Sequence, residues 1–328
     1  MTYKGRSLYN LLQMNLKQNP DLEVEPWQVE VYRDLSEEIL FSLLESHQIF
    51  LDRDNFLLYV DACDSPEDLA DCLYLEEDYA VHAKVFLCVF ELWRRLCPHK
   101  QSLSLFVDEL DHLIEQYEEG NLENEEALNE SLESFQTILD DNIDEGGNPQ
   151  DGYHFFSAYS CHDLEVFTYE YISHQIDMEN DQYASELLEG FYPYVDNKRW
   201  FDLLRIRLVA AADPKEGNVM IDRLLLSLKE EPELYLLFET LHFLIYQGEM
   251  ESFALIFNQA VQQLETEEDL GELLMLAAEY LESIDKEKEW GVINDLLSEQ
   301  KEKTSQGALD PSNKTLQVLK DIMGFSSV

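Results

Sequence analysis

Histidine and cysteine are the side chains that most often ligate zinc, but their spacing in this chain matches no zinc motif. The eight histidines and five cysteines include two mixed groups, Cys97-Pro98-His99 and Cys161-His162-Asp163. Zinc ligands within one segment usually lie about two to five residues apart, whereas these side chains are nearly adjacent. No H-E-x-x-H or C-x-x-C sequence is present. We therefore predict no metal site at these groups and no resident cofactor.

An acidic segment offers a second kind of cation site, because calcium prefers carboxylate and carbonyl oxygens. Asp140, Asn142 and Asp144 alternate like the first ligands of an EF-hand loop, and Asp151 lies twelfth. The sixth position holds Glu145 where that loop needs glycine, and Asp151 replaces the usual bidentate glutamate. Two interpretations stay open, a divalent-ion sensor or enzyme that uses this segment and a solvated linker, and the departures favour the linker.

Sequence signatures of common nucleophilic and nucleotide-binding sites are absent. The chain contains no G-x-S-x-G, G-x-x-x-x-G-K-[ST] or G-x-G-x-x-G motif. Carboxylate pairs are too abundant to single out an acid–base pair. We therefore expect a protein that is not an enzyme.

Net charge restricts the partners that this chain can bind. It carries 69 Asp and Glu residues against 22 Lys and Arg residues, a formal net charge of −47. No Lys or Arg occurs between Lys100 and Lys198, and this stretch holds 25 Asp and Glu residues. Nucleic-acid phosphates and anionic membranes attract cationic surfaces, so we expect neither as a direct partner. A basic or amphipathic protein segment fits the charge, and the alternative is that the acids only solvate helix faces.

The cysteine count and the apolar runs predict the compartment. Five cysteines without a C-x-x-C pair favour reduced, buried thiols over a disulfide framework. The N-terminus lacks the continuous apolar run of a secretory signal, and no apolar stretch reaches about 18 residues. We expect a cytoplasmic protein without a membrane span.

Apolar residues at three- and four-residue spacing predict helices along nearly the whole chain, and an all-α fold. In the N-terminal half this spacing predicts helices at 6–18, 27–50, 54–63, 66–75, 78–97, 102–118 and 124–143. Ser65 and Pro66 supply a helix start, and the broad apolar side of 80–97 predicts a central helix. The acids, glycines and proline of 140–152 predict a loop.

From residue 163 the predicted helices come in pairs of similar length. The pairs are 163–178 with 181–195, 198–212 with 215–229, 232–247 with 250–265, and 268–284 with 287–301, followed by a capping helix at 312–323. A fixed period of this kind predicts a helical solenoid, in which neighbouring hairpins bury one another's apolar faces. The expected organisation is a helical N-terminal domain at 1–118, an acidic helix and flexible acidic linker at 119–152, and a solenoid domain at 153–328.

Leu273, Leu276, Ala277 and Tyr280 have the large-large-small-aromatic spacing that opens a tetratricopeptide repeat, and the pairs over roughly 160–302 resemble that family. Similar positions are the turn at 246–249, the aromatic and small residues Phe257 and Ala260, and the opening pair Trp200 and Leu203. Phe253 and Leu241 depart from the pattern, because the family prefers small residues there. A HEAT-like or other helical array is the alternative.

Similarity to that family implies a concave groove that grips a peptide or protein segment. In some members, basic side chains of first helices clamp a partner's C-terminal carboxylate, and Arg199 and Arg205 could do so here. Pairing with nearby acids such as Asp202 and Asp222 is the alternative.

Aromatic side chains near the acidic stretch are the other candidate contacts for a partner. The candidates are Tyr192, Tyr194, Tyr153 and Phe155, with packing in the hairpin core as the alternative. The expected function is therefore an adaptor or chaperone, by analogy a secretion chaperone. The alternative is an acidic nucleic-acid mimic that occludes a DNA- or RNA-binding protein.

Overall fold

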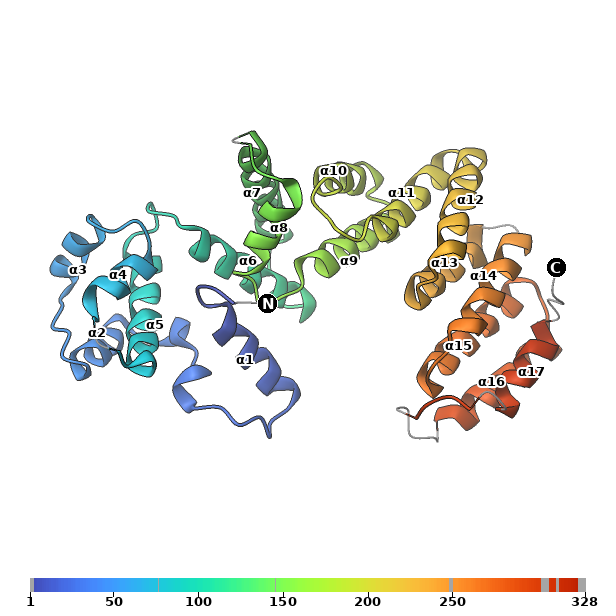
Figure 1. Ribbon diagram of the computed structural model, residues 1–328, viewed down its shortest axis with the longest axis horizontal. Helices are drawn as coiled ribbons and strands as arrows, with labels where there is room; N and C mark the ends of the chain where they lie inside the picture. Colours follow the sequence, from blue (N-terminus) through green and yellow to red (C-terminus); the bar gives the residue numbers. More distant parts are fainter. Residues whose placement is uncertain are drawn as a thin grey trace. The chain divides into compact units, whose positions relative to one another are not determined.

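The computed structural model describes residues 3–75, 77–144, 146–247, 250–301, 307–310 and 313–323, and these residues form an all-helical protein (Figure 1). Within them the only β-bridge joins Thr266 and Ala308. No helix in this part of the chain is long and apolar enough to span a bilayer. The chain divides into two compact units: unit 1 is Met1–Glu170 with Pro193–Asp196, and unit 2 is Tyr171–Tyr192 with Asn197–Val328.

Unit 1 is organised around a central helix, α5 (Tyr79–Leu96). The other helices are α1 (Ser7–Gln18), the 3-10 turns Pro26–Gln28 and Tyr32–Asp34, α2 (Glu37–Ser46), α3 (Arg53–Val60), α4 (Pro66–Leu73), α6 (Leu103–Glu118), α7 (Glu125–Asp144), α8 (Pro149–Ser157) and the start of α9 (Leu164–Asp177). As predicted, α5 is buried, with every residue from Val85 to Trp93 in the core, and α2 and α4 pack on it. Ser65 caps α4, because its Oγ accepts a hydrogen bond from Asp68 N at 3.1 Å.

The single helix predicted at 27–50 is wrong. Two 3-10 turns replace its first part, and α2 begins only after its cap, Ser36. The Arg95 guanidinium on α5 donates to the backbone carbonyls of Leu35 at 2.6 Å and Arg33 at 2.8 Å. A continuous helix would use those carbonyls itself, so this distant arginine stabilises a non-helical segment that local spacing could not predict.

The loop predicted at 140–152 is mostly helical. Helix α7 continues to Asp144, and α8 begins at Pro149, where Asn148 Oδ1 accepts from Gln150 N at 3.1 Å. Helix α8 packs on α7, and the rings of Phe135 and Phe156 stack with centroids 4.2 Å apart. These helices belong to unit 1, whose main segment ends at Glu170 and not at the predicted boundary of 152.

Unit 2 is built from successive helix pairs, as predicted from the sequence period. Its helices after α9 are α10 (Asp181–Phe191), α11 (Lys198–Ala212), α12 (Pro214–Glu230), α13 (Leu234–Gln247), α14 (Met250–Gln263), α15 (Glu267–Ser283), α16 (Glu287–Lys301) and α17 (Lys314–Met323). Helix α11 packs on α12, α13 on α14, and α15 on α16, while α11, α13 and α15 also pack in succession. The pair predicted at 163–195 is not one of these close pairs, since α10 packs on α11.

The residues that resemble the tetratricopeptide signature form part of the unit 2 core. Leu273, Leu276, Ala277 and Tyr280 are all buried. Phe253 of α14, where the family prefers a small residue, stacks on Tyr280 with ring centroids 3.9 Å apart and an interplanar angle of 9°. An aromatic pair therefore fills this helix contact. Gly248 and Glu249 of the expected turn lie outside the described residues.

Gly217 sets how closely α11 and α12 approach. A Cβ at this position would lie 2.6 Å from Ala210 Cβ and 2.8 Å from its Cα, which is closer than van der Waals contact allows. We expect Gly217→Ala to destabilise unit 2 by about 1–3 kcal/mol through overpacking. Thermal unfolding followed by circular dichroism measures this. Gly217→Ala combined with Ala210→Gly should recover part of the loss, and an unchanged melting temperature for Gly217→Ala would contradict the close approach.

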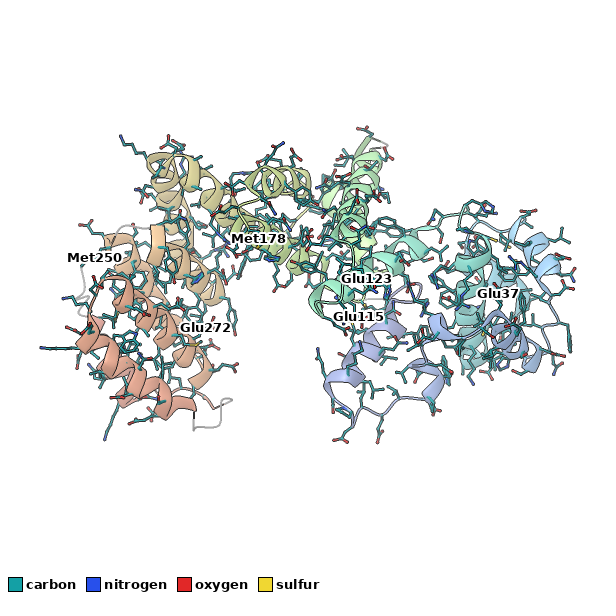
Figure 2. All side chains as sticks on the ribbon, turned by 180° about the vertical axis from the view of Figure 1, so that it is seen from behind. Glu37, Glu115, Glu123, Met178, Met250 and Glu272 are labelled. Atoms are coloured by element: carbon teal, nitrogen blue, oxygen red, sulfur yellow. The ribbon has the colours of Figure 1, made fainter. Side chains whose placement is uncertain are left out.

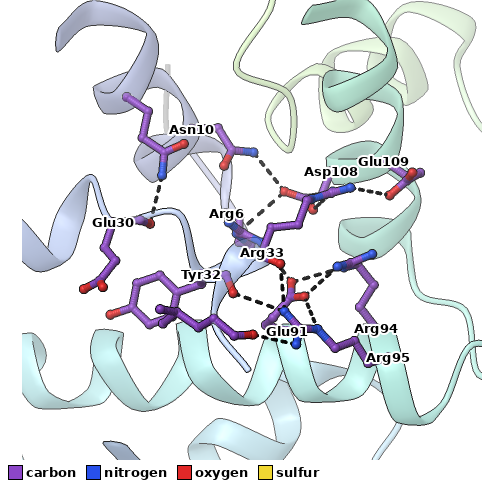
Figure 3. A network of polar contacts seen from close by, with 12 residues as sticks. Arg6, Asn10, Glu30, Tyr32, Arg33, Glu91, Arg94, Arg95, Asp108 and Glu109 are labelled. Atoms are coloured by element: carbon purple, nitrogen blue, oxygen red, sulfur yellow. Dashed lines mark hydrogen bonds and ion pairs between the residues drawn. The ribbon is translucent and has the colours of Figure 1, made fainter. Parts of the chain in front are cut away.

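Buried charge holds the helices of unit 1 together. Four arginines, Arg6, Arg33, Arg94 and Arg95, surround the carboxylates of Glu91 and Asp108 (Figure 3). Glu91 on α5 is fully buried and accepts from Arg94 Nη2 at 2.5 Å and Arg95 Nε at 2.6 Å. Burial raises the pKa of Asp108, but Arg6 and Arg33 outweigh burial and hold that pKa below its usual value. The network thereby joins four parts of unit 1, which are the start of α1, the segment that precedes α2, helix α5 and helix α6.

Replacing Glu91 by glutamine tests this network. Because Arg6, Arg94 and Arg95 would lose their shared negative charge inside the protein, we expect a loss of about 3–5 kcal/mol in the stability of unit 1. Urea unfolding followed by the fluorescence of the buried Trp93 measures it. The matched control is Glu109→Gln, a half-exposed partner of Arg33 whose loss should cost less than about 1 kcal/mol. Equal effects of the two substitutions would contradict the central role of Glu91.

Candidate functional site

The two arginines expected to clamp a partner's carboxylate are engaged by carboxylates of unit 2. Arg199 Nη2 lies 2.8 Å from Glu233 Oε2. Arg205 Nη2 lies 2.9 Å from Glu189 Oε1, and its guanidinium also covers the Tyr192 ring at 4.1 Å from the centroid. The geometry therefore matches the alternative of pairing with local acids, and a carboxylate clamp would have to displace these contacts.

The aromatic candidates in unit 1 are mostly core residues. Tyr153 and Tyr194 are buried, and the Tyr194 hydroxyl donates a hydrogen bond to Asp140. Phe155 is the exception, with 49% of its surface exposed and Lys4 Nζ at 4.2 Å from its ring centroid. The expectation that Tyr153 and Tyr194 contact a partner is thus corrected, because packing within the unit encloses both rings.

The acidic segment does not form an EF-hand loop. Asp140, Asn142 and Asp144 lie on α7 and Asp151 lies on α8. Residues two apart on a helix point in different directions, so the alternating oxygens cannot converge as they do in a calcium loop. The sixth loop position lies outside the described residues.

A different set of side chains forms an accessible surface on unit 2. The accessible positions are Tyr235, Glu239, His242 and Tyr246 on α13, and Glu268, Glu272, Met275, Glu279 and Glu282 on α15. Spacing of three and four residues places each set on one side of its helix. The helices pack together, and His242 Nε2 lies 3.9 Å from Glu279 Oε2, which joins the two sets. We call these nine residues the α13–α15 face.

Three large side chains on this face are open to solvent. Tyr235 is 59% exposed, Tyr246 is 68% exposed and Met275 is 49% exposed. Tyrosine and methionine are enriched where proteins contact other proteins, because they bury much area and adapt in shape. The face therefore has the apolar component that a binding surface needs.

No lysine or arginine on α13 or α15 balances the negative charge of the α13–α15 face. No Lys or Arg occurs between Lys229 and Lys286, an interval that holds 14 Asp and Glu residues. Burial first, and then the charges of Glu239, Asp269 and Glu268, raise the pKa of Glu272, which Figure 2 shows on α15. Ionised carboxylates on this face therefore make the ionisation of a neighbouring carboxyl group less favourable. A cation bound beside them would relieve that repulsion. This interval is the sequence signal for the face, although the longer interval at 101–197 overshadows it.

The face thus combines exposed tyrosines and a methionine with at least three mutually repelling carboxylates. Its chemistry suits a positively charged, partly apolar ligand. Comparison with known proteins gives no relative, since no family model, curated protein or solved structure matches the chain.

Carboxyl titration tests the charge crowding at Glu272. In a carbon-13 NMR pH titration, we expect the pKa of Glu272 to lie above that of an ordinary glutamate, and Glu239→Gln to lower it by removing a neighbouring charge. Glu251→Gln, on α14, is the control that removes the same charge elsewhere and should leave the Glu272 pKa unchanged. An identical Glu272 pKa with and without Glu239 would show that the two carboxylates do not interact.

Proposed function

We propose that this protein is a non-enzymatic adaptor or chaperone and that its α13–α15 face holds a basic, amphipathic segment of another protein. The observation that carries the proposal is the crowding of Glu239, Glu268 and Glu272 beside exposed Tyr235, Tyr246 and Met275. In this proposal, unit 2 is a tetratricopeptide-like solenoid. A more specific version of this proposal is that the protein is a chaperone for an exported protein.

Helix pairing supports the repeat interpretation. The first helices α11, α13 and α15 begin at Lys198, Leu234 and Glu267, which are 36 and 33 residues apart. Each packs on its own second helix, and α11 packs on α13 and α13 on α15, as stacked hairpins do. First helices in such arrays share one side of the stack, so their exposed positions can act together on one extended segment.

Charge and apolar contact have separate roles in the proposed recognition. The carboxylates attract a Lys- or Arg-containing segment and set its orientation, an effect that salt weakens. The tyrosines and Met275 then bury apolar side chains of that segment, which supplies most of the affinity. A purely basic segment should therefore bind more weakly than a basic segment with leucines at helical spacing.

A labelled helical peptide of lysines and leucines tests the proposal. Its affinity for the full-length protein can be measured by fluorescence anisotropy at low and high salt. We expect Glu239→Gln with Glu272→Gln to weaken binding about tenfold at low salt, because two electrostatic attractions at the face are lost. Lower pH should weaken binding too, since Glu272 takes up a proton at a higher pH than an ordinary glutamate.

A second double variant separates the face from general charge attraction. Glu251→Gln with Glu299→Gln, on α14 and α16, makes the same change in net charge away from the face. We expect this control to bind the peptide nearly as well as the unchanged protein does. Equal weakening by both double variants would mean that the peptide only senses overall charge, and the proposed face would be wrong.

A further inference from the structure

A second constellation lies in unit 1, where residues far apart in sequence meet. Asp111 on α6 faces Cys161 and His162 in the loop between α8 and α9, and one ligand atom of each lies within 4.8 Å of the others. Among the described residues, this is the only such group of three metal-ligating side chains. Asp111 is buried and the other two are partly buried.

Hydrogen bonds already hold this loop against α6. Asp111 Oδ1 accepts from Ser160 Oγ at 2.5 Å, and Oδ2 accepts from Cys161 N at 2.9 Å. His162 Nδ1 lies 3.7 Å from a carboxylate oxygen of Glu118. This distance is too long for a hydrogen bond, so Glu118 does not fix the orientation of the imidazole. The hydrogen bonds from Ser160 and Cys161 hold the loop that carries Cys161 and His162 against Asp111.

The same three side chains line a cavity of about 500 Å³ in unit 1. Arg6 and Arg33 also line it, but their ion pairs are with Glu91, Asp108 and Glu109, and no ion pair to Asp111 occurs in the described part of the chain. The Asp111 carboxylate is thus buried without a basic partner, beside a thiol and an imidazole. A small cation can reach the group from the cavity.

We propose that Asp111, Cys161 and His162 bind one zinc-class divalent cation, with a fourth coordination position open to the cavity. Carboxylate oxygen, thiolate sulfur and imidazole nitrogen are all zinc ligands, and three protein ligands with one open position is a common arrangement. Tetrahedral ligand atoms lie roughly 3.3–3.8 Å apart when each is about 2.0–2.3 Å from zinc, so the group has to contract by at most about 1.5 Å from its limit of 4.8 Å. Binding replaces the Cys161 thiol proton by the metal and releases that proton to solvent.

Cobalt titration of the full-length protein is the test, because tetrahedral Co²⁺ bound to a thiolate absorbs differently from Co²⁺ on carboxylates alone. We expect one equivalent of Co²⁺ to produce a thiolate charge-transfer band that one equivalent of Zn²⁺ removes. Cys161→Ser should abolish the band and weaken Zn²⁺ binding more than about 100-fold, beyond the loss usual for an outer-shell residue. Cys72→Ser, which removes an exposed cysteine, should leave the band unchanged.

Because the protein surface is acidic, Co²⁺ can also bind to surface carboxylates away from the proposed site, and the absorption spectrum distinguishes the two cases. Absorption of octahedral Co²⁺ without a thiolate band would mean that surface carboxylates alone bind the metal, and the proposal would be overturned. A thiolate band that survives Cys161→Ser would also overturn it. His162→Gln, with circular dichroism to verify folding, provides a second ligand variant in case Cys161→Ser is unstable, and it should weaken Zn²⁺ binding as well.

Discussion

The scarcity of positive charge is the constraint on which the rest of this structure depends. There are 22 Lys and Arg residues for 69 Asp and Glu residues, so most acids cannot have a basic partner. In unit 1 four arginines are committed to the buried carboxylates of Glu91 and Asp108. In unit 2 Arg199 and Arg205 pair with Glu233 and Glu189. Among the described residues no lysine or arginine pairs with the α13–α15 face, and the proposed binding of a cationic partner rests on the repulsion between its carboxylates.

A buried arginine–carboxylate network contributes modestly to stability but is costly to break, so it fixes which helices meet in unit 1. Crowded carboxylates on α13 and α15 cost some stability in the free protein, and in the proposed function a basic partner would recover that cost on binding. The same reasoning applies on a smaller scale to Asp111, whose burial beside Cys161 and His162 favours a cation.

Local spacing predicted most of the fold, because helices with one apolar side leave a clear period. The helix pairs from α11 to α16 and the cap at Ser65 agree closely with those predicted from the sequence. The errors arise where distant residues decide the structure. Arg95 holds residues 33–35 out of a helix, and packing on Phe135 stabilises α8 despite its neighbouring glycines.

Candidate site residues were less predictable than helices. Whether an arginine or tyrosine is free depends on its neighbours in space, as Arg205 with Glu189 and the buried Tyr194 show. The sequence alone also cannot reveal that Asp111 lies beside Cys161 and His162 in the fold, because these residues are far apart along the chain. The α13–α15 face did leave a signal, in the Lys- and Arg-free interval at 230–285 combined with accessible side chains at helical spacing.

Mapping the footprint of a basic amphipathic peptide by backbone amide chemical shifts tests the central claim most directly. We predict that the largest changes fall on α13 and α15, around Glu239, His242 and Glu272. Changes centred instead on α7, which lies in the longer Lys- and Arg-free stretch, would show that charge density alone attracts the peptide and would contradict the assignment of the α13–α15 face.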